Sequence, residues 1–128
     1  MAAVVHLDTH AVVLLYAQGP TAVSAAARTV LEDSDRLVVS PMVRLEMQYL
    51  QEIGRLSVTP LSVLDYLTGV LPLSVCDQSF AHVARSAEQE QWTRDPFDRL
   101  IVAAARRAKA PLLSRDRRIT QHYSQAFW

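Results

Sequence analysis

Short apolar runs alternate along this chain with longer segments of helical spacing, and no other feature limits the possible folds as strongly. The apolar runs cover residues 2–7, 37–39, 71–76, 112–113 and 126–128. Such runs, with helical segments between them, are typical of buried parallel strands joined by helical crossovers. The sequence therefore predicts an α/β fold: a three-layer α/β/α sandwich with a central parallel sheet of four to five strands.

Breakers and capping residues set the bounds of the helices between these runs. Gly19 and Pro20 separate the first two helical segments. Ser40 supplies an N-cap before a proline at the first helical position. Asp77 is expected to cap the helix that follows the third apolar run. The predicted helices cover residues 9–17, 23–32, 41–54, 60–69, 78–91 and 96–109.

The composition fits one globular domain over residues 1–128. Of the 128 residues, 50% are hydrophobic and 20% are charged, which supports one compact core and leaves no room for a second. No apolar run is long enough to span a membrane, and the first residues lack a secretory signal, so we expect no membrane association and a cytoplasmic protein. The single cysteine, Cys76, cannot form an internal disulfide or a thiolate zinc site, and its expected role is core packing.

The neutral total charge hides an uneven distribution. Residues 1–93 carry 5 basic and 10 acidic side chains, whereas residues 94–128 carry 8 basic and 3 acidic ones. A basic C-terminal quarter attracts polyanions, but a solvated helix face rich in arginine has the same composition. Charge alone favours the solvated face.

Two carboxylates occupy unusual positions in this pattern. Asp8 directly follows the first predicted strand, where ligands bind in open α/β sheets, although an aspartate there can also cap the next helix. Glu46 interrupts an apolar stripe on the helix that begins at Pro41. The stripe contains Met42, Val43, Tyr49, Leu50 and Ile53. An isolated carboxylate in such a setting takes up a proton unless a cation compensates for the lost water, so Glu46 indicates a metal or catalytic role, with a salt bridge to arginine as the alternative.

Asp95 and Asp98 lie where the last long helix begins. Asp95 before Pro96 has the features of an N-cap, and Asp98 falls in the first turn, where negative charge suits the helix dipole. Residues 100–105 of this helix are apolar on all sides, which predicts that the helix is buried and that Asp98 points into the molecule. We therefore favour a functional role for Asp98 and a mainly capping role for Asp95.

Asp116 completes the acidic set. It follows the strand at residues 112–113, and Ser114 lies two positions earlier on the same face, although Asp116 can also cap residues 117–120. Since the carboxyl ends of parallel strands share one edge of a sheet, the sequence predicts that four carboxylates converge there: Asp8, Glu46, Asp98 and Asp116. They repel one another without a cation, and oxygen ligands without a cysteine or histidine cluster favour one or two Mg²⁺ or Mn²⁺ ions over zinc.

With these residues in place, the chain resembles the PIN-domain ribonucleases, and more narrowly the VapC-like toxins of type II toxin–antitoxin pairs. The resemblance spans the whole chain and rests on residues 7–11, 94–101 and 112–116 and on Glu46; the run Asp-Pro-Phe-Asp-Arg at 95–99 is its most specific part. It implies a metal site of Asp8, Glu46, Asp98 and Asp116, with Asp95 nearby and Thr9 and Ser114 as supporting hydroxyls. The chain departs from many relatives in having Trp92 and Thr93 where they carry histidines, and Leu45 where a tryptophan is frequent.

The resemblance also implies a function. Metal ions held by the carboxylates activate a water for attack on an RNA phosphodiester. RNA phosphates are expected to contact Arg94, Arg99, Arg115, Arg117 and Arg118, which flank the acidic residues in sequence. Arg106, Arg107 and Lys109 lie further along the helix and more naturally complement its C-terminus. The expected partners are a small antitoxin, which blocks the acidic pocket with a basic or aromatic side chain, and a second copy of the chain in a homodimer.

Two other functions remain open. One is a catalytically silent PIN-like module that acts by binding protein or RNA. The other is a different Mg²⁺-dependent α/β phosphatase or a receiver domain, which the spacing disfavours: position 10, where such a phosphatase has its second aspartate, is His10, and the only lysine, Lys109, precedes the late strand. His6 and His10 have no partner at ligand spacing and no serine or cysteine nucleophile beside them, so a catalytic role is disfavoured for both. Packing is also favoured for three aromatic residues, Tyr16, Trp92 and Trp128.

Overall fold

A five-stranded parallel sheet forms the centre of the computed structural model, which describes residues 3–128. The strand order is β3-β2-β1-β4-β5. The strands are β1 (Val4–Leu7), β2 (Arg36–Val39), β3 (Leu73–Val75), β4 (Leu112–Leu113) and β5 (Ala126–Phe127). The predicted parallel sheet is therefore confirmed.

The register of β1 aligns the ends of three strands. Leu7, the last residue of β1, pairs with Val39 of β2 and with Leu113 of β4. The next residue after each strand, Asp8, Ser40 and Ser114, therefore lies at one edge of the sheet. The strand order also reverses between β1 and β4, which is where open α/β sheets form their ligand crevice.

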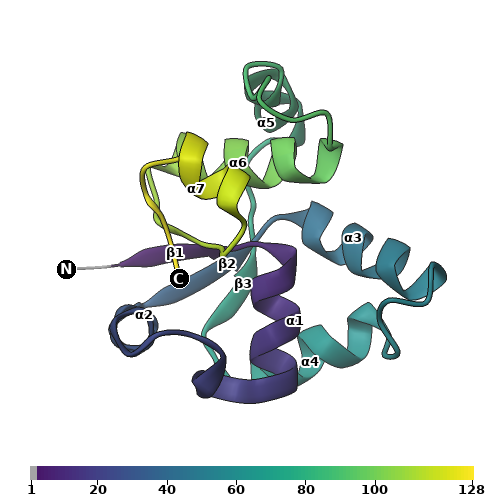
Figure 1. The fold of residues 1–128 in the computed structure, drawn as a ribbon, viewed down its shortest axis with the longest axis vertical. Coiled ribbons are helices and arrows are strands. Elements are labelled where there is room, and N and C mark those ends of the chain that lie inside the picture. The colour runs from purple at the N-terminus through teal and green to yellow at the C-terminus, as the bar shows by residue number, and fades with distance from the viewer. Residues whose placement is uncertain (1–2) are drawn as a thin grey trace.

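Seven helices surround the sheet. They are α1 (Thr9–Gln18), α2 (Ala25–Glu32), α3 (Pro41–Glu52), α4 (Pro60–Val70), α5 (Phe80–Ala87), α6 (Pro96–Ala108) and α7 (Arg117–His122), with a 3-10 turn η1 (Gly19–Ala22) after α1. In the view of Figure 1, α5, α6 and α7 lie above the sheet and α1, α2 and α4 lie below it. Helix α3 extends outward beyond the carboxyl ends of the strands, in contact with α1, α4 and α6. The predicted three-layer arrangement is confirmed.

Two predicted bounds around β3 were wrong. Helix α5 begins at Phe80 and ends at Ala87, so it is shorter than the predicted 78–91. Its N-cap is Ser79 and not Asp77, because the Ser79 hydroxyl accepts the backbone N–H of His82. Strand β3 is also shorter than the predicted 71–76, since Leu71 still caps α4 and the following proline has no N–H to donate to a neighbouring strand.

Helix α6 packs two faces against apolar neighbours. Ile101 and Val102 belong to the main core with the sheet, and Ala103 and Ala104 contact Val83 and the rest of α5 in a smaller cluster. The prediction that this helix is buried on all sides is confirmed for residues 101–105. A half-buried Cys76 packs against the same smaller cluster, as expected. Within residues 3–128, no helix combines the length and hydropathy needed to cross a membrane.

Candidate functional site

Asp8 is buried at the end of β1 and caps α1. Its side chain is 5% exposed, and its Oδ1 accepts the backbone N–H of Ala11 at 2.8 Å. Burial raises the pKa of Asp8 above its ordinary value, while hydrogen bonds from the Ser114 hydroxyl and the Ala11 backbone act in the opposite direction. Both sequence interpretations of Asp8, a helix cap and a carboxylate at the sheet edge, therefore hold in one residue.

Glu46 is buried on α3 and faces α1. Its Oε1 accepts a hydrogen bond from the hydroxyl of Thr9, which is 1% exposed, while Glu46 itself is 8% exposed. Burial raises the pKa of Glu46, the Thr9 hydrogen bond lowers it, and the Asp95 carboxylate raises it further. The alternative of a salt bridge to arginine was wrong, because the one ion pair in residues 3–128 joins Arg106 to Glu90.

The surroundings of Glu46 differ in part from the predicted buried stripe. Val43 and Met47 are buried on either side of it, but Tyr49 is 49% exposed and Ile53 is 47% exposed. Helix α3 leaves the edge of the sheet, so its outer half has fewer elements to pack against. Glu46 therefore lies where the core meets the surface, and a solvent-borne ion or substrate can approach it.

Asp98 is the carboxylate on which the charges of the other four acidic residues act. It lies half-buried in the first turn of α6, and its pKa is raised to about 7. Burial is the largest cause, and the remaining contributions come from the negative charges of Asp95, Glu46, Asp116 and Asp8. The structure thus brings together all five acidic residues that the sequence singled out.

Asp95 and Asp116 are exposed and cap the two helices that begin beside the cluster. Asp95 Oδ1 accepts the backbone N–H of Phe97 at 2.8 Å and that of Asp98 at 3.3 Å. Asp116 Oδ1 accepts the backbone N–H of Arg118 at 2.8 Å and that of Ile119 at 3.3 Å. The cap interpretation therefore holds for both residues. Each cap nevertheless leaves its carboxylate close enough to Asp98 to raise the pKa of that residue.

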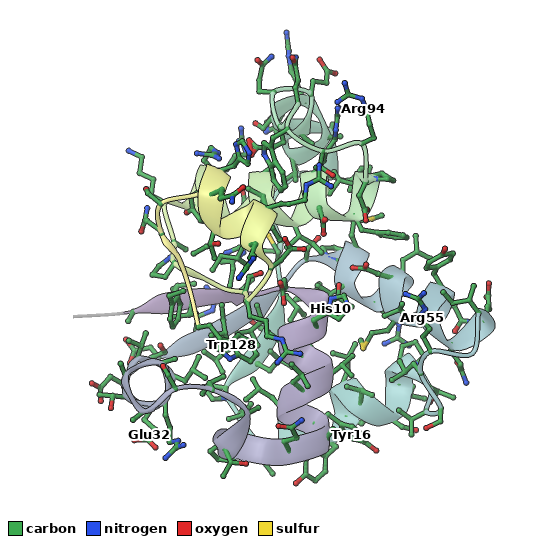
Figure 2. All side chains as sticks on the ribbon, in the orientation of Figure 1. His10, Tyr16, Glu32, Arg55, Arg94 and Trp128 are labelled. Carbon is green, nitrogen blue, oxygen red and sulfur yellow. The ribbon has the colours of Figure 1, made fainter. Side chains whose placement is uncertain are left out.

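Two supporting residues link the acidic side chains. Ser114 is fully buried, and its Oγ accepts the backbone N–H of Asp116 at 3.1 Å while its hydroxyl also bonds to Asp8. Thr9 ties α1 to Glu46 through its own hydroxyl. The exposed His10 lies in the first turn of α1 (Figure 2), where its charge lowers the pKa of both Asp8 and Glu46. The hydroxyls of Thr9 and Ser114 thus hold the carboxylates of Glu46 and Asp8 and the backbone of Asp116.

The sequence was also compared with models of known protein families. The sequence profile of the PIN domain matches residues 5–124. The chain belongs to the PIN domain family. This confirms the family resemblance seen in residues 95–99. PIN domains are generally nucleases, and they generally use divalent metal ions.

Two solved structures are similar to this PIN domain. A chain of VapBC2 from Rickettsia felis, solved bound to a DNA fragment from their promoter, is 19% identical with a TM-score of 0.63, and the match covers 92% of each chain. A chain of FitAB bound to an IR36 DNA fragment is 18% identical with a TM-score of 0.49, over 96% of this chain and 93% of that one. At these identities the likeness concerns the fold alone. Among curated proteins, no sequence matches the chain significantly.

The donor chemistry of this PIN domain fits a hydrated divalent cation. Within residues 3–128, no three Asp, Glu, His or Cys side chains form a ready-made metal cluster. The carboxylates act on one another through space without converging on one point. Mg²⁺ is usually bound through one or two carboxylates and keeps several of its waters, so it does not need such a cluster, whereas oxygen donors without thiolate or imidazole do not suit a structural zinc.

The candidate RNA-binding arginines surround the start of α6 and α7. Arg94 Nη1 donates to the carbonyl of Gln91 at 2.9 Å, and Arg99 Nε donates to the carbonyl of Thr93 at 2.9 Å. Figure 2 shows Arg94 on the loop that leads into α6. Arg115 lies over the Trp128 ring, 5.7 Å from its centroid. The loop at 88–95 therefore uses part of the hydrogen-bonding capacity of these side chains.

The structure adds residues that sequence reasoning missed. Glu90 is 4% exposed and paired with Arg106, although its run Glu-Gln-Glu-Gln reads as a solvated surface. Thr93 is 2% exposed, and its hydroxyl accepts the backbone N–H of Asp95 at 3.1 Å. No local pattern marks Glu90 as buried, because its partner Arg106 lies on α6. His6 is also buried, and burial followed by the charge of Arg36 lowers its pKa to about 4, so it is neutral near pH 7.

Proposed function

We propose that this chain is a metal-dependent ribonuclease that hydrolyses RNA phosphodiester bonds, and that it is the toxin of a type II toxin–antitoxin pair. The observation that carries the proposal is the position of Asp98, whose pKa is raised to about 7 by burial and by four neighbouring carboxylates. Repulsion within such an acidic cluster at the carboxyl edge of a parallel sheet destabilises the folded protein. A bound cation would offset this repulsion, which favours a functional role for the cluster. Membership of a family of nucleases supports the same conclusion.

In the proposed reaction, different side chains of this chain have different roles. Asp8, Asp98 and Asp116 would hold Mg²⁺ or Mn²⁺, with Glu46 and Asp95 at the border of the site. When bound, such an ion activates a water for attack on the phosphodiester and stabilises charge on the leaving oxygen. The Thr9 hydroxyl occupies Glu46 Oε1, so Oε2 is the atom of Glu46 left to accept a proton or to orient a water.

The basic side chains beside the cluster would hold the RNA. We assign phosphate contacts to Arg94, Arg99, Arg115, Arg117 and Arg118, which lie around the N-termini of α6 and α7. The guanidinium groups of Arg94, Arg99 and Arg118 each keep N–H donors beyond those that the loop at 88–95 uses. Contacts of this kind give affinity that depends on salt and little on sequence.

A homodimer is proposed through the outer face of α3. Leu45, Tyr49 and Ile53 form one apolar ridge with exposed fractions of 53%, 49% and 47%, and contiguous exposed apolar surface often marks an interaction site. Arg44 and Glu52 flank this ridge, two turns apart. When two copies of α3 pack antiparallel, Arg44 of each faces Glu52 of the other and the apolar ridges meet, so the face is complementary to itself.

The second proposed partner is a small antitoxin protein. The VapBC2 structure, which has the same fold as this chain, is a complex of that kind. A basic or aromatic side chain of the antitoxin would enter the acidic site, because a cation or a planar hydrogen-bond donor neutralises the carboxylates around Asp98. Co-expression with the product of an adjacent small gene is expected to yield a stable complex.

The decisive experiment is RNA cleavage by the purified chain with and without Mn²⁺, compared with Asp8→Asn and Asp65→Asn. Asparagine still accepts the Ala11 N–H and caps α1, so Asp8→Asn removes the charge while keeping the fold. We expect cleavage that requires metal, is lost in Asp8→Asn and is retained in Asp65→Asn, whose carboxylate lies on α4. Equal absence of cleavage in all three chains, with RNA still bound, would favour the silent binding module.

A further inference from the structure

Trp92 contacts two elements that the acidic site depends on. Its indole Nε1 donates to Glu90 Oε1 at 3.1 Å, within the loop that leads into α6. Its ring stacks on the His122 ring at the end of α7, with centroids 5.0 Å apart and planes 7° from parallel. Arg118 of α7 donates from Nη2 to the Trp92 carbonyl at 2.6 Å and lies over the same ring.

Glu90 anchors this arrangement to the body of the molecule. Its buried carboxylate accepts two bonds from Arg106 of α6, from Nε at 3.1 Å and from Nη2 at 3.0 Å. Arg106 Nη2 also donates to the carbonyl of His122 at 3.0 Å. We call these five residues the Trp92 clamp: Glu90, Trp92, Arg106, Arg118 and His122.

The clamp supplies the polar links between α7 and its neighbours. In the part of the chain from residue 3 to residue 128, two hydrogen bonds join α7 to another helix or to the loop at 88–95: Arg118 to Trp92 and Arg106 to His122. Both belong to the clamp. The apolar contribution of α7 comes from Ile119, which is 1% exposed. The polar links that position α7 relative to α6 therefore all belong to the clamp.

The two helices that the clamp joins both begin at the acidic site. Trp92 lies three residues before Asp95, the N-cap of α6, and Arg118 lies two residues after Asp116, the N-cap of α7. Asp98 and Asp116 carry like charges, which push the two helix starts apart when no cation lies between them. The stack of Trp92 on His122 and the hydrogen bonds of Arg118 and Arg106 oppose that separation.

We propose that Trp92 is a positioning residue, which holds α7 against α6 and so fixes the spacing of Asp98 and Asp116 before a divalent cation arrives. Preset spacing of the ligands lowers the cost of binding the ion, and supporting residues of this kind change metal affinity by about 10- to 100-fold. This inference rests on the proposed metal-dependent function. It also explains why an aromatic side chain stands at position 92, with its ring flat against that of His122.

The test compares three variants by Mn²⁺ titration of thermal stability, without RNA. We expect Trp92→Ala to raise the Mn²⁺ concentration for half-maximal stabilisation by about 10-fold, and Trp92→Phe, which keeps a ring against His122, to stay within about 2-fold of wild type. The control is Tyr16→Ala. Tyr16 stacks edge-on against Tyr66 and lies below the sheet in the view of Figure 2, whereas α7 lies above it, so its loss lowers stability without moving the metal midpoint. An unchanged midpoint in Trp92→Ala overturns the proposal.

A second measurement separates the clamp from the function on which it rests. Amide hydrogen exchange of residues 117–122, in the absence of metal, is expected to quicken in Trp92→Ala and not in Tyr16→Ala. Exchange that quickens equally in both variants assigns Trp92 to general packing and overturns the proposal, even if Mn²⁺ binds. If wild type shows no response to Mn²⁺, the metal-dependent function fails, and the exchange data still decide whether Trp92 holds α7. Should Trp92→Ala fail to fold, Arg118→Gln removes the bond to the Trp92 carbonyl and is expected to shift both readouts in the same direction.

Discussion

The Thr9 hydroxyl donates a hydrogen bond to the Glu46 carboxylate, and both side chains are almost fully buried. Thr9 begins α1 directly after β1, whereas Glu46 lies in the middle of α3. This bond therefore joins the first strand's end to the helix that follows the second strand. It also satisfies a buried carboxylate that has no arginine partner in residues 3–128.

Removing the Thr9 hydroxyl should destabilise the protein. Thr9→Val keeps the shape of the side chain but leaves Glu46 Oε1 without its donor, and an unsatisfied buried acceptor costs about 1–3 kcal/mol. Urea denaturation near neutral pH measures this loss. Thr29→Val is the matched control, because the Thr29 hydroxyl bonds only to the Ala25 carbonyl on the exposed side of α2. Equal stability of the two variants would contradict the proposed contribution of the Thr9–Glu46 hydrogen bond to the free energy of unfolding.

Divalent metal should stabilise the wild type through Glu46 and its neighbours. A ligand that binds only the folded state, at 100 times its Kd, adds about 2.7 kcal/mol of stability. Glu46→Gln still accepts the Thr9 hydrogen bond but removes one repelling charge, so we expect a higher Tm without metal and a smaller rise with Mg²⁺ or Mn²⁺. Glu32→Gln, on the exposed side of α2, should respond to metal as wild type does. A full metal response in Glu46→Gln would remove Glu46 from the site.

Without metal, Asp98 should make the protein less stable as the pH rises. Folding raises the pKa of Asp98 from 3.8 to about 7, so the folded state holds this proton more tightly than the unfolded state does. The resulting stabilisation is complete below the unfolded pKa of 3.8 and is lost as the pH rises from there to the folded pKa of about 7. Burial raises the pKa values of Asp8 and Glu46 in the same direction.

The measurement is Tm against pH in a chelating buffer, for wild type and Asp98→Asn. We expect the Tm of the variant to rise relative to that of wild type between about pH 4 and pH 7, reaching a difference of about 5 °C or more. With excess Mn²⁺, wild type should have the higher Tm of the two, because the ion stabilises its charged carboxylates. Parallel curves for the two chains would show that Asp98 is not the group that titrates.

Binding of RNA should depend on salt through the arginines beside the site. In an Asp8→Asn background, which prevents cleavage, Arg117→Gln is expected to weaken binding of single-stranded RNA and to reduce the slope of log K against log salt by about 0.7, the value for one lost phosphate contact. Lys109→Gln, beyond the other end of α6, should leave the slope unchanged. Titration of a labelled oligonucleotide at several salt concentrations measures both slopes. If the two variants lose equal slope, the attraction comes from overall charge.

Self-association through α3 should depend on the opposite charges of Arg44 and Glu52. Light scattering is expected to give twice the 14.3 kDa chain mass for the wild type. Arg44→Glu or Glu52→Arg alone should produce monomers, because each places like charges opposite one another in an antiparallel pair. The double charge reversal should restore the dimer, which a nonspecific effect on folding cannot do. Single variants that stay dimeric would place the interface elsewhere.

Much of the fold and the membership of the acidic cluster could be predicted from the sequence. Short apolar runs predict buried strands because their pattern is local, and N-caps such as Ser40 and Asp95 bond to backbone groups two or three residues away. The carboxylates follow from the same reasoning, since residues after parallel strands share one edge of the sheet. Even Glu46 is marked locally, by the apolar residues around it.

The tertiary structure decided what depends on contacts between distant segments. Glu90 is buried because Arg106, on another helix, reaches it, and Trp92 stacks on His122, which lies thirty positions later in the chain. Tyr49 continues an apolar pattern but stays half-exposed, because α3 leaves the sheet there. The same reason applies to Asp98: its position in α6 follows from its neighbours in sequence, but its raised pKa comes from four carboxylates that folding brings near it. Local hydrogen bonding and periodicity act over a few residues, whereas burial and charge repulsion depend on which elements meet.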